Sequence, residues 1–320
     1  MVVRRLSHLS FSRPTAVTLG TFDGLHRGHQ ALFDKVKSLA KERELRSVVL
    51  TFSQPPQNHI NGKPKKKLIL PLKKKLELLA SSGIDEVVVV GFQEIGTLSP
   101  LEFAQRILKE QLKVADVVVG YDCRFGRDRA GDGETLKTLG DAFGFRVTVI
   151  EPVMVDGVVV SSTEVRRAIQ AGDVERAVRL LGYTPFLCGR VVQGHGSGRR
   201  LGSSGGNLVV SENLVTPEEG LFLVRASLSE RDEVGILSIK HRPGLQDNSK
   251  FLEVRLLNAR VDRLNGAEME LTLLKRLREE EDHIERMRRL ANYNRSRAAR
   301  AVDMPLWTLR SKMKKLGVER

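Results

Sequence analysis

The stretch AVTLGTFDGLHRGHQ, residues 16–30, decides the expected fold of the first part of the chain. Ala16–Leu19 is a short apolar run that predicts a buried strand. A loop rich in glycine follows, and the helical periodicity of Gln30–Arg43 predicts a helix directly after it. The segment is therefore expected to form a strand, a loop and the beginning of a helix.

The same alternation continues outward to residue 150. The expected strands are Ser47–Phe52, Glu86–Gly91, Ala115–Gly120 and Arg146–Ile150, and the expected helices are Leu72–Ala80, Pro100–Leu112 and Glu134–Phe143. Strands that alternate with helices predict an α/β domain with a parallel sheet covered on both faces. Ligands of such sheets bind at the carboxyl ends of the strands. The pattern becomes wholly helical over Ser161–Leu181.

The loop after the first strand has the residues of a phosphate-binding turn. Gly20, Gly24 and Gly28 allow a ligand to approach the backbone closely. His26 and His29 are three residues apart, so at the start of a helix they point the same way. Two imidazoles beside free N–H groups can hold a triphosphate. A histidine pair at this spacing can also be half of a metal site or a chance pairing.

The second half of the chain changes character. Short strand-like runs separated by Gly, Asp and Asn predict a small antiparallel β-barrel; they are Cys188–Val192, Leu221–Ser227, Glu233–Ile239, Phe251–Leu257 and Glu268–Leu274. From Asp282 the chain is helical and basic. We therefore predict three domains, at residues 1–185, 186–281 and 282–320.

The full string GxFDGxHxGH, between a strand and a helix, resembles the adenylyltransferase domain of bacterial riboflavin kinase/FMN adenylyltransferases, in the HxGH nucleotidyltransferase superfamily. The resemblance implies a Rossmann-like domain in which His26 and His29 act on the phosphates of ATP. It also implies Mg²⁺ as cofactor, FMN as acceptor and FAD as product.

Two further segments are similar to motifs of that family. Gly120–Asp132 resembles GxDFRFGxxRxGD, and Ser161–Arg166 resembles SSTxIR, which implies that Arg166 contacts phosphates. Solvated arginines, and a helix cap at Ser162 or Thr163, are the structural alternatives. The family's TFxPHP segment has lost its histidine here, although His59 could replace it. The expected ligand-binding residues are Gly20, Phe22, Asp23, Gly24, Gly28, Asp122, Arg124, Ser161, Ser162, Thr163 and Asn207.

The barrel resembles a riboflavin kinase whose signature is altered. Asn207 of the family's Phe-Pro-Thr-Ala-Asn segment is retained and is expected to bind magnesium, but Gly205 replaces the threonine. In Phe251–Val254, which resembles the family's LEVH strand, Glu253 matches the catalytic base that deprotonates riboflavin. Glu253 can equally be an outward-facing strand residue. Kinase activity is left open, because glycine offers no hydroxyl ligand.

The charge of the chain is strongly positive and uneven. Of a net charge of +14, residues 284–320 contribute 11 Lys and Arg against 3 acids, which favours polyanionic partners. The lysines between Lys63 and Lys75 are interpreted as a solvated surface. With two cysteines, no apolar run of membrane-spanning length and no signal peptide, we expect a cytoplasmic protein.

The last segment, NRSRAARAVDMPLWTLRSKMKKLGV, resembles the DNA-binding end of Fis-type regulators. It predicts a helix-turn-helix, although a basic helical pair packed on the barrel is the alternative. The residues expected to face DNA are Trp307, Thr308, Arg310, Ser311, Lys312, Lys314 and Lys315. Two functions follow: synthesis of FAD from FMN and ATP with possible riboflavin kinase activity, or a flavin-responsive DNA-binding regulator built on the same scaffold.

Overall fold

The computed structural model describes residues 1–6, 11–54, 66–193, 205–227, 232–241, 250–256 and 264–277. The chain divides into two compact units that alternate along the sequence. The first unit contains Met1–Arg166, Arg179–Gly182 and Glu212–Val215. The second contains Arg167–Val178, Tyr183–Ser211 and the described residues from Thr216 onward.

The first unit is built on a six-stranded sheet in the order β1-β4-β3-β2-β5-β6, in which every pair of neighbours is parallel. The strands are β1 (Val2–Arg5), β2 (Thr15–Gly20), β3 (Arg46–Phe52), β4 (Glu86–Val90), β5 (Val114–Gly120) and β6 (Arg146–Ile150). The five strands predicted from the pattern are confirmed. A further strand, β1, was not predicted; it is an edge strand of four residues that pairs with β4 on one side only.

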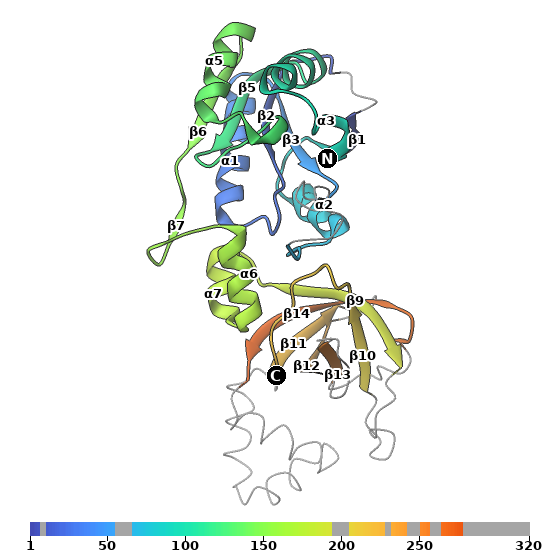
Figure 1. Cartoon of the computed structure of the whole chain (residues 1–320). Helices are drawn as coiled ribbons and strands as arrows, with labels where there is room; N and C mark the ends of the chain where they lie inside the picture. Colours follow the sequence, from blue (N-terminus) through green and yellow to red (C-terminus); the bar gives the residue numbers. More distant parts are fainter. Residues whose placement is uncertain are drawn as a thin grey trace, which may run out of the picture. The chain divides into compact units, whose positions relative to one another are not determined.

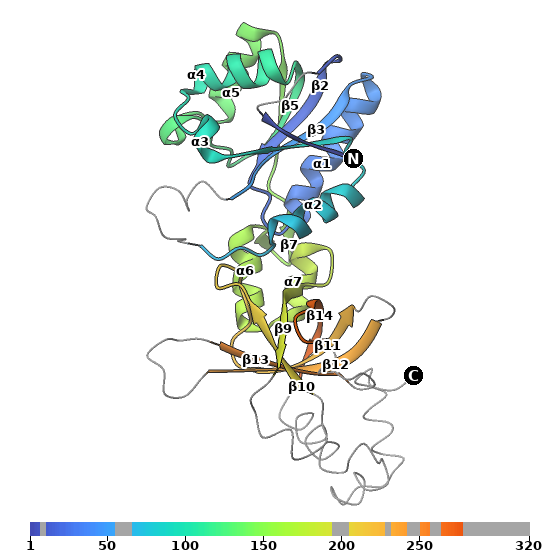
Figure 2. The ribbon, with the colours of Figure 1, turned by 90° about the vertical axis from the view of Figure 1, so that its right-hand side faces the viewer.

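Helices cover both faces of this sheet, as predicted. They are α1 (Arg27–Glu42), α2 (Leu72–Ser81), α3 (Phe92–Ile95), α4 (Pro100–Glu102), which continues as the π-helix η3 (Phe103–Gln111), and α5 (Gly133–Phe143); a 3₁₀ turn, η4, lies at Arg127–Arg129. Figures 1 and 2 show α1 on one face and α4 and α5 on the other. Alternate strand residues such as Val17, Val48 and Val117 form one core with Ile107 of η3 and Leu136 of α5.

The registers bring the carboxyl ends of the central strands together. Gly20 at the end of β2 pairs with Thr51 of β3, and Gly120 ends β5 on the other side of β2. The loop with the two histidines and the segment from Tyr121 therefore leave the sheet at the same edge. This is the edge at which an α/β sheet binds ligands.

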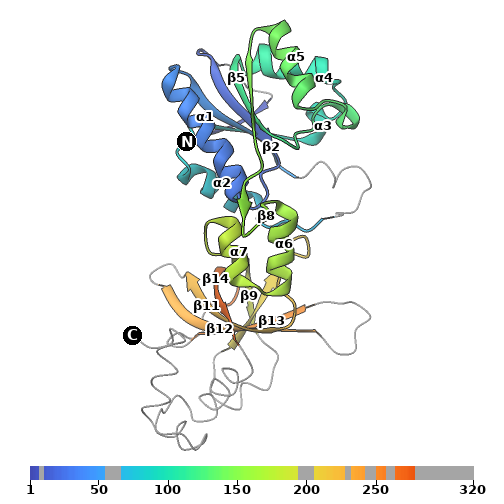
Figure 3. The same ribbon diagram turned by 90° about the vertical axis from the view of Figure 1, so that its left-hand side faces the viewer.

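The region predicted as wholly helical is a pair of helices, α6 (Ser162–Ala171) and α7 (Val174–Leu181), which lie side by side in Figure 3. Gly172 interrupts the run with a φ of 71°, a left-handed conformation that favours glycine. A short hairpin of β7 (Met154–Val155) and β8 (Val158–Val159), which the sequence analysis did not predict, precedes α6.

The second unit contains a closed antiparallel barrel in the order β10-β13-β12-β11-β14-β9. Its strands are β9 (Phe186–Gln193), β10 (Gly205–Val210), β11 (Gly220–Ser227), β12 (Asp232–His241), β13 (Lys250–Leu256) and β14 (Glu268–Arg276). The predicted barrel is confirmed with one additional strand, β10. That strand was missed because its two leading glycines suggest a loop.

Two predictions concern residues outside this description. The helix-turn-helix and its seven DNA-facing residues fall within 278–320, and His59 falls within 55–65, so the structure describes neither. Among the helices of the described ranges, none is long and apolar enough to cross a membrane.

Candidate functional site

The two histidines of the first loop stack on each other at the start of α1. Their ring centroids are 3.6 Å apart, and the ring planes are inclined by 20°. His26 is the N-cap residue of α1, and its carbonyl accepts hydrogen bonds from the backbone N–H groups of His29 and Gln30. The three-residue spacing predicts that the two rings point the same way, and the structure agrees with that geometry.

Both rings keep an unused hydrogen-bonding atom. Nδ1 of His26 and Nδ1 of His29 are buried and have no hydrogen-bond partner among the described residues. His26 is only 5 % exposed, whereas His29 is partly exposed. Because buried polar atoms in proteins are nearly always paired, two unpaired nitrogens on adjacent rings suggest a ligand.

The residues around the pair hold the rings in place. Phe22 is buried, and its ring meets His29 edge-on with centroids 5.2 Å apart. A Cβ at Gly28 would lie 3.2 Å from Nδ1 of His26. Gly24 has a φ of 85°, and a Cβ there would lie 2.8 Å from Ile69. Phe22, Gly24 and Gly28 thus shape the site through packing and backbone conformation.

The surroundings of both imidazoles favour the neutral form. Burial, followed by the charge of Arg166, lowers the pKa of His26 to about 4. Burial also lowers the pKa of His29 well below its ordinary value, and the charges of His26 and Lys75 lower it further. A neutral imidazole still has one N–H to donate. Bound anions favour its protonated form, so polyphosphate binding would draw protons onto this pair.

Asp23 contacts two other predicted motif residues, Ser162 and Arg166. Its carboxylate accepts hydrogen bonds from the backbone N–H groups of Ile69 and Leu70 and lies 2.6 Å from Nη2 of Arg166. The hydroxyl of Ser162 donates to the Asp23 carbonyl at 2.8 Å. The first and third motifs, almost 140 residues apart in sequence, therefore meet in one site. Within it, Asp23 orients Arg166.

Other predicted residues lie at the start of α6 and in the segment after β5. Ser161, rather than Ser162 or Thr163, caps α6, since its Oγ accepts a hydrogen bond from the N–H of Glu164. Ser162 is not the cap because its hydroxyl is directed to Asp23. Asp122 and Arg124, which follow β5, are exposed, and Arg124 donates to the Cys123 carbonyl.

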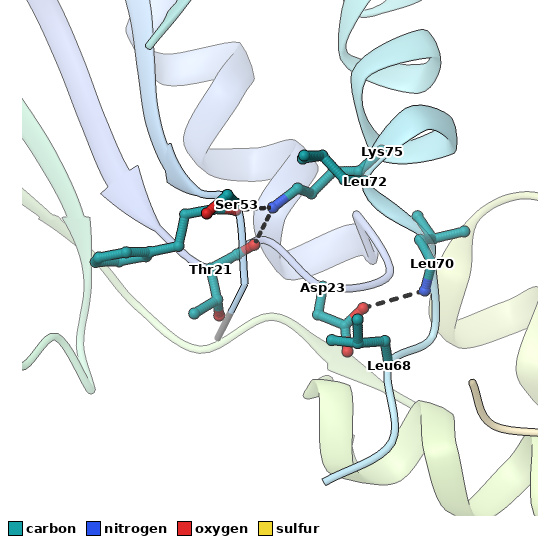
Figure 4. A pocket seen from close by; sticks show the side chains of 8 residues that line it. Thr21, Asp23, Ser53, Leu68, Leu70, Leu72 and Lys75 are labelled. Carbon is teal, nitrogen blue, oxygen red and sulfur yellow. Dashed lines mark hydrogen bonds between the residues drawn. The ribbon is translucent and has the colours of Figure 1, made fainter. Parts of the chain in front are cut away.

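Lys75 is a buried residue of this site that the sequence analysis misassigned. The lysine run was interpreted as a solvated surface, which is wrong for Lys75, because it is 7 % exposed. Its ammonium lies at the ends of β2 and β3 and lines a small pocket together with Thr21 and Asp23 (Figure 4). A signal was present in the sequence: Lys75 is three residues after Leu72 and four before Leu79, on the apolar side of the helix.

The described residues offer no resident metal centre. No group of three or more His, Cys, Asp or Glu side chains in the described ranges could hold a metal ion. Magnesium ions commonly keep several waters and bind through substrate phosphates.

The barrel residues that match or depart from the riboflavin kinase motifs lie on two neighbouring strands, β10 and β13. Asn207 of β10 is directly opposite Glu253 of β13, and Gly205 is opposite Arg255. Arg255 donates through Nε to the Glu253 carboxylate at 2.9 Å. In the LEVH motif, Arg255 replaces the histidine, so the expected base is held by a guanidinium.

Comparison with known proteins identifies both halves of the chain. The family model for FAD synthetase matches residues 9–164, and that for riboflavin kinase matches residues 181–296. A bifunctional riboflavin kinase/FMN adenylyltransferase of Pseudomonas fluorescens is 35% identical over 271 residues, 84% of this chain and 86% of the relative. Its counterpart in Escherichia coli K12 is 33% identical over 83% of this chain and 85% of the relative. A crystal structure from Streptococcus pneumoniae, described as a macrolide-efflux protein, matches with a TM-score of 0.77 and 26% identity, covering 87% of this chain and 91% of that chain.

Proposed function

Because the chain belongs to the bifunctional riboflavin kinase/FMN adenylyltransferase family, we propose that its first unit uses His26, His29 and Arg166 to transfer AMP from ATP to FMN. The chain is an FMN adenylyltransferase by family. The assignment of individual residues to steps of the reaction is our proposal.

The observation that carries this assignment is the stacked pair of histidines with two unpaired buried nitrogens. The pair lies at the start of α1, where backbone N–H groups and the helix dipole favour an anion. Arg166 adds a positive charge that is anchored by Asp23. A triphosphate is the ligand class that matches this set of donors.

The chemistry needs positioning and charge stabilisation more than a general base. A phosphate oxygen of FMN attacks the α-phosphorus of ATP, forming a new P–O bond. The bond from the α-phosphorus to the bridging oxygen breaks, and pyrophosphate leaves with the electron pair. FMN phosphate is largely ionised at pH 7, so it can attack without losing a proton. The imidazoles and Arg166 would stabilise the negative charge that develops on the transferred group.

The test is to incubate the purified full chain with FMN and MgATP and to measure FAD and pyrophosphate. We expect both products in equal amounts. The variant His29→Ala should lose nearly all of this activity, by a factor of about 100 to 1000, as for removal of one charge-stabilising donor. His241→Ala, which removes an imidazole from the barrel strand β12, is the matched control and should match the wild type. No FAD from the wild type, or full activity of His29→Ala, would refute the assignment.

For the barrel we propose riboflavin phosphorylation by ATP, with Glu253 as base and Asn207 beside it. Their direct pairing across β10 and β13 supports this proposal. Gly205 lacks the hydroxyl of the family's threonine, and Arg255 occupies the Glu253 carboxylate with a hydrogen bond. We therefore expect slow formation of FMN from riboflavin, measured as FMN and ADP in the same preparation.

The regulatory alternative has no support among the described residues or the relatives. Its helix-turn-helix lies outside the described residues, and none of the relatives named above is described as binding DNA. It stays a sequence-based prediction.

A further inference from the structure

The ammonium of Lys75 donates three hydrogen bonds at the carboxyl ends of β2 and β3. Its Nζ donates to the Thr21 carbonyl at 3.1 Å, to Oγ1 of Thr51 at 3.0 Å and to the Phe52 carbonyl at 2.8 Å. An ammonium has three N–H donors, so these acceptors use all of them. Figure 4 shows the side chain reaching from α2 to the Thr21 carbonyl.

These contacts connect parts of the chain that must stay in register. Thr21 begins the loop that leads to His26 and His29 at the start of α1, and Phe52 ends the neighbouring strand β3. Thr51 reinforces the link, because its hydroxyl also donates to the Thr21 carbonyl at 3.2 Å. The Lys75 ammonium therefore fixes the point where the histidine loop leaves the sheet.

The charge of Lys75 also acts on the site. Asp23 of the same loop raises the pKa of Lys75, but burial dominates and lowers it to about 8. In turn, the positive charge of Lys75 helps to keep His29 neutral. Arg166 of α6 is the other cation of the site, and it is paired with Asp23. On α2 itself, Lys74 is paired with Glu77.

We propose that Lys75 is a positioning residue for adenylyl transfer, which clamps the histidine loop to β3 and supplies a fixed positive charge beside His29. The inference rests on the proposed function of the first unit. Lys75 acts through the loop and through His29, since its own three donors are already used by the protein.

The test compares three variants of the full chain. Lys75→Met removes the donors and the charge, Lys75→Arg keeps a charge, and Lys73→Met is the control on the exposed side of α2. For Lys75→Met we expect kcat for FAD formation to fall on the order of 100-fold, as for a misplaced catalytic group. Lys75→Arg should recover much of this loss, and Lys73→Met should match the wild type. Wild-type kcat in Lys75→Met would overturn the inference.

The pH profile provides the second readout, which a purely structural role would not move. In the wild type, kcat/KM for MgATP should fall above about pH 8, as the Lys75 ammonium loses its proton. In Lys75→Arg this fall should disappear, because a guanidinium stays charged. An unchanged alkaline fall in Lys75→Arg would overturn the inference. This comparison decides the matter even if Lys75→Met does not fold. A wild type without FAD synthesis would instead overturn the proposed function, and this inference with it.

Discussion

Replacing Asp23 by Ala tests how the site is held together. The Asp23 side chain is only 6% exposed. Its carboxylate accepts hydrogen bonds from two backbone N–H groups and from the Arg166 guanidinium, and the substitution removes this acceptor. All three lost hydrogen bonds are to an ionised carboxylate, and each costs about 1.5 kcal/mol, the lower end of the range for such bonds. The total of about 4 to 5 kcal/mol lies within the range for breaking a buried ion pair from one side.

The effect should be local and can be measured by residue-resolved hydrogen exchange. A loss of about 4 to 5 kcal/mol corresponds to a decrease in protection of about 1000-fold or more for the amides of Ile69 and Leu70. The amide of Leu68, which donates to the Asn213 carbonyl instead, is an internal reference. Asp23→Asn keeps an acceptor oxygen and should lose about half as much. Asp85→Ala, which removes a more exposed carboxylate from the backbone N–H of Ser47, is the matched control. Wild-type protection of Ile69 and Leu70 in Asp23→Ala would refute this account.

Three further predictions follow from distances and pKa values. Gly28→Ala should fold normally but form FAD about 10- to 100-fold more slowly in an initial-rate assay, because the new Cβ lies 3.2 Å from the His26 ring; an unchanged rate would show that the ring can move freely. The pKa of His26 is about 4 in the folded chain and 6.5 in the unfolded chain. The unfolded chain therefore binds a proton first, and the free energy of unfolding falls as the pH drops from 6.5 towards 4. Between pH 7 and 4.5 we expect His26 to lower the free energy of unfolding, measured in urea, by about 2.5 kcal/mol, and this loss should be absent in His26→Asn. Arg255→His should speed riboflavin phosphorylation about tenfold or more by freeing the Glu253 carboxylate; the same FMN rate as the wild type would count against any effect of the arginine.

The sequence predicted the elements whose patterns are local. β2 and α1 are continuous apolar or periodic runs on either side of a glycine loop, and the structure contains both. The meeting of the histidine loop with Ser162 and Arg166 was expected from a resemblance, and the hydrogen bonds to Asp23 agree with it.

The features that were missed depend on distant partners. β1 has two exposed valines and is a strand only because β4 offers a free edge. β10 begins with two glycines, and its pairing with β9 and β13 supplies the hydrogen bonds that its own composition does not predict. Lys75 belongs to a run of three lysines, and only the packing of α2 distinguishes the buried one from its neighbours.

The segment Glu212–Val215 has a consequence for any attempt to separate the two activities. These four residues belong to the first unit, although they follow β9 and β10 of the second unit in the sequence. From Thr216 onward, the described residues belong to the second unit again. Within that unit, Leu214 bridges to Leu68, and Leu68 exchanges backbone hydrogen bonds with Asn213 and Val215. Leu68 lines the pocket and directly precedes the amides held by Asp23. A fragment that ends at residue 185 would therefore lack the backbone partners of Leu68, a residue that lines this pocket. The two family domains follow each other in the sequence, but the two compact units exchange short segments of the chain.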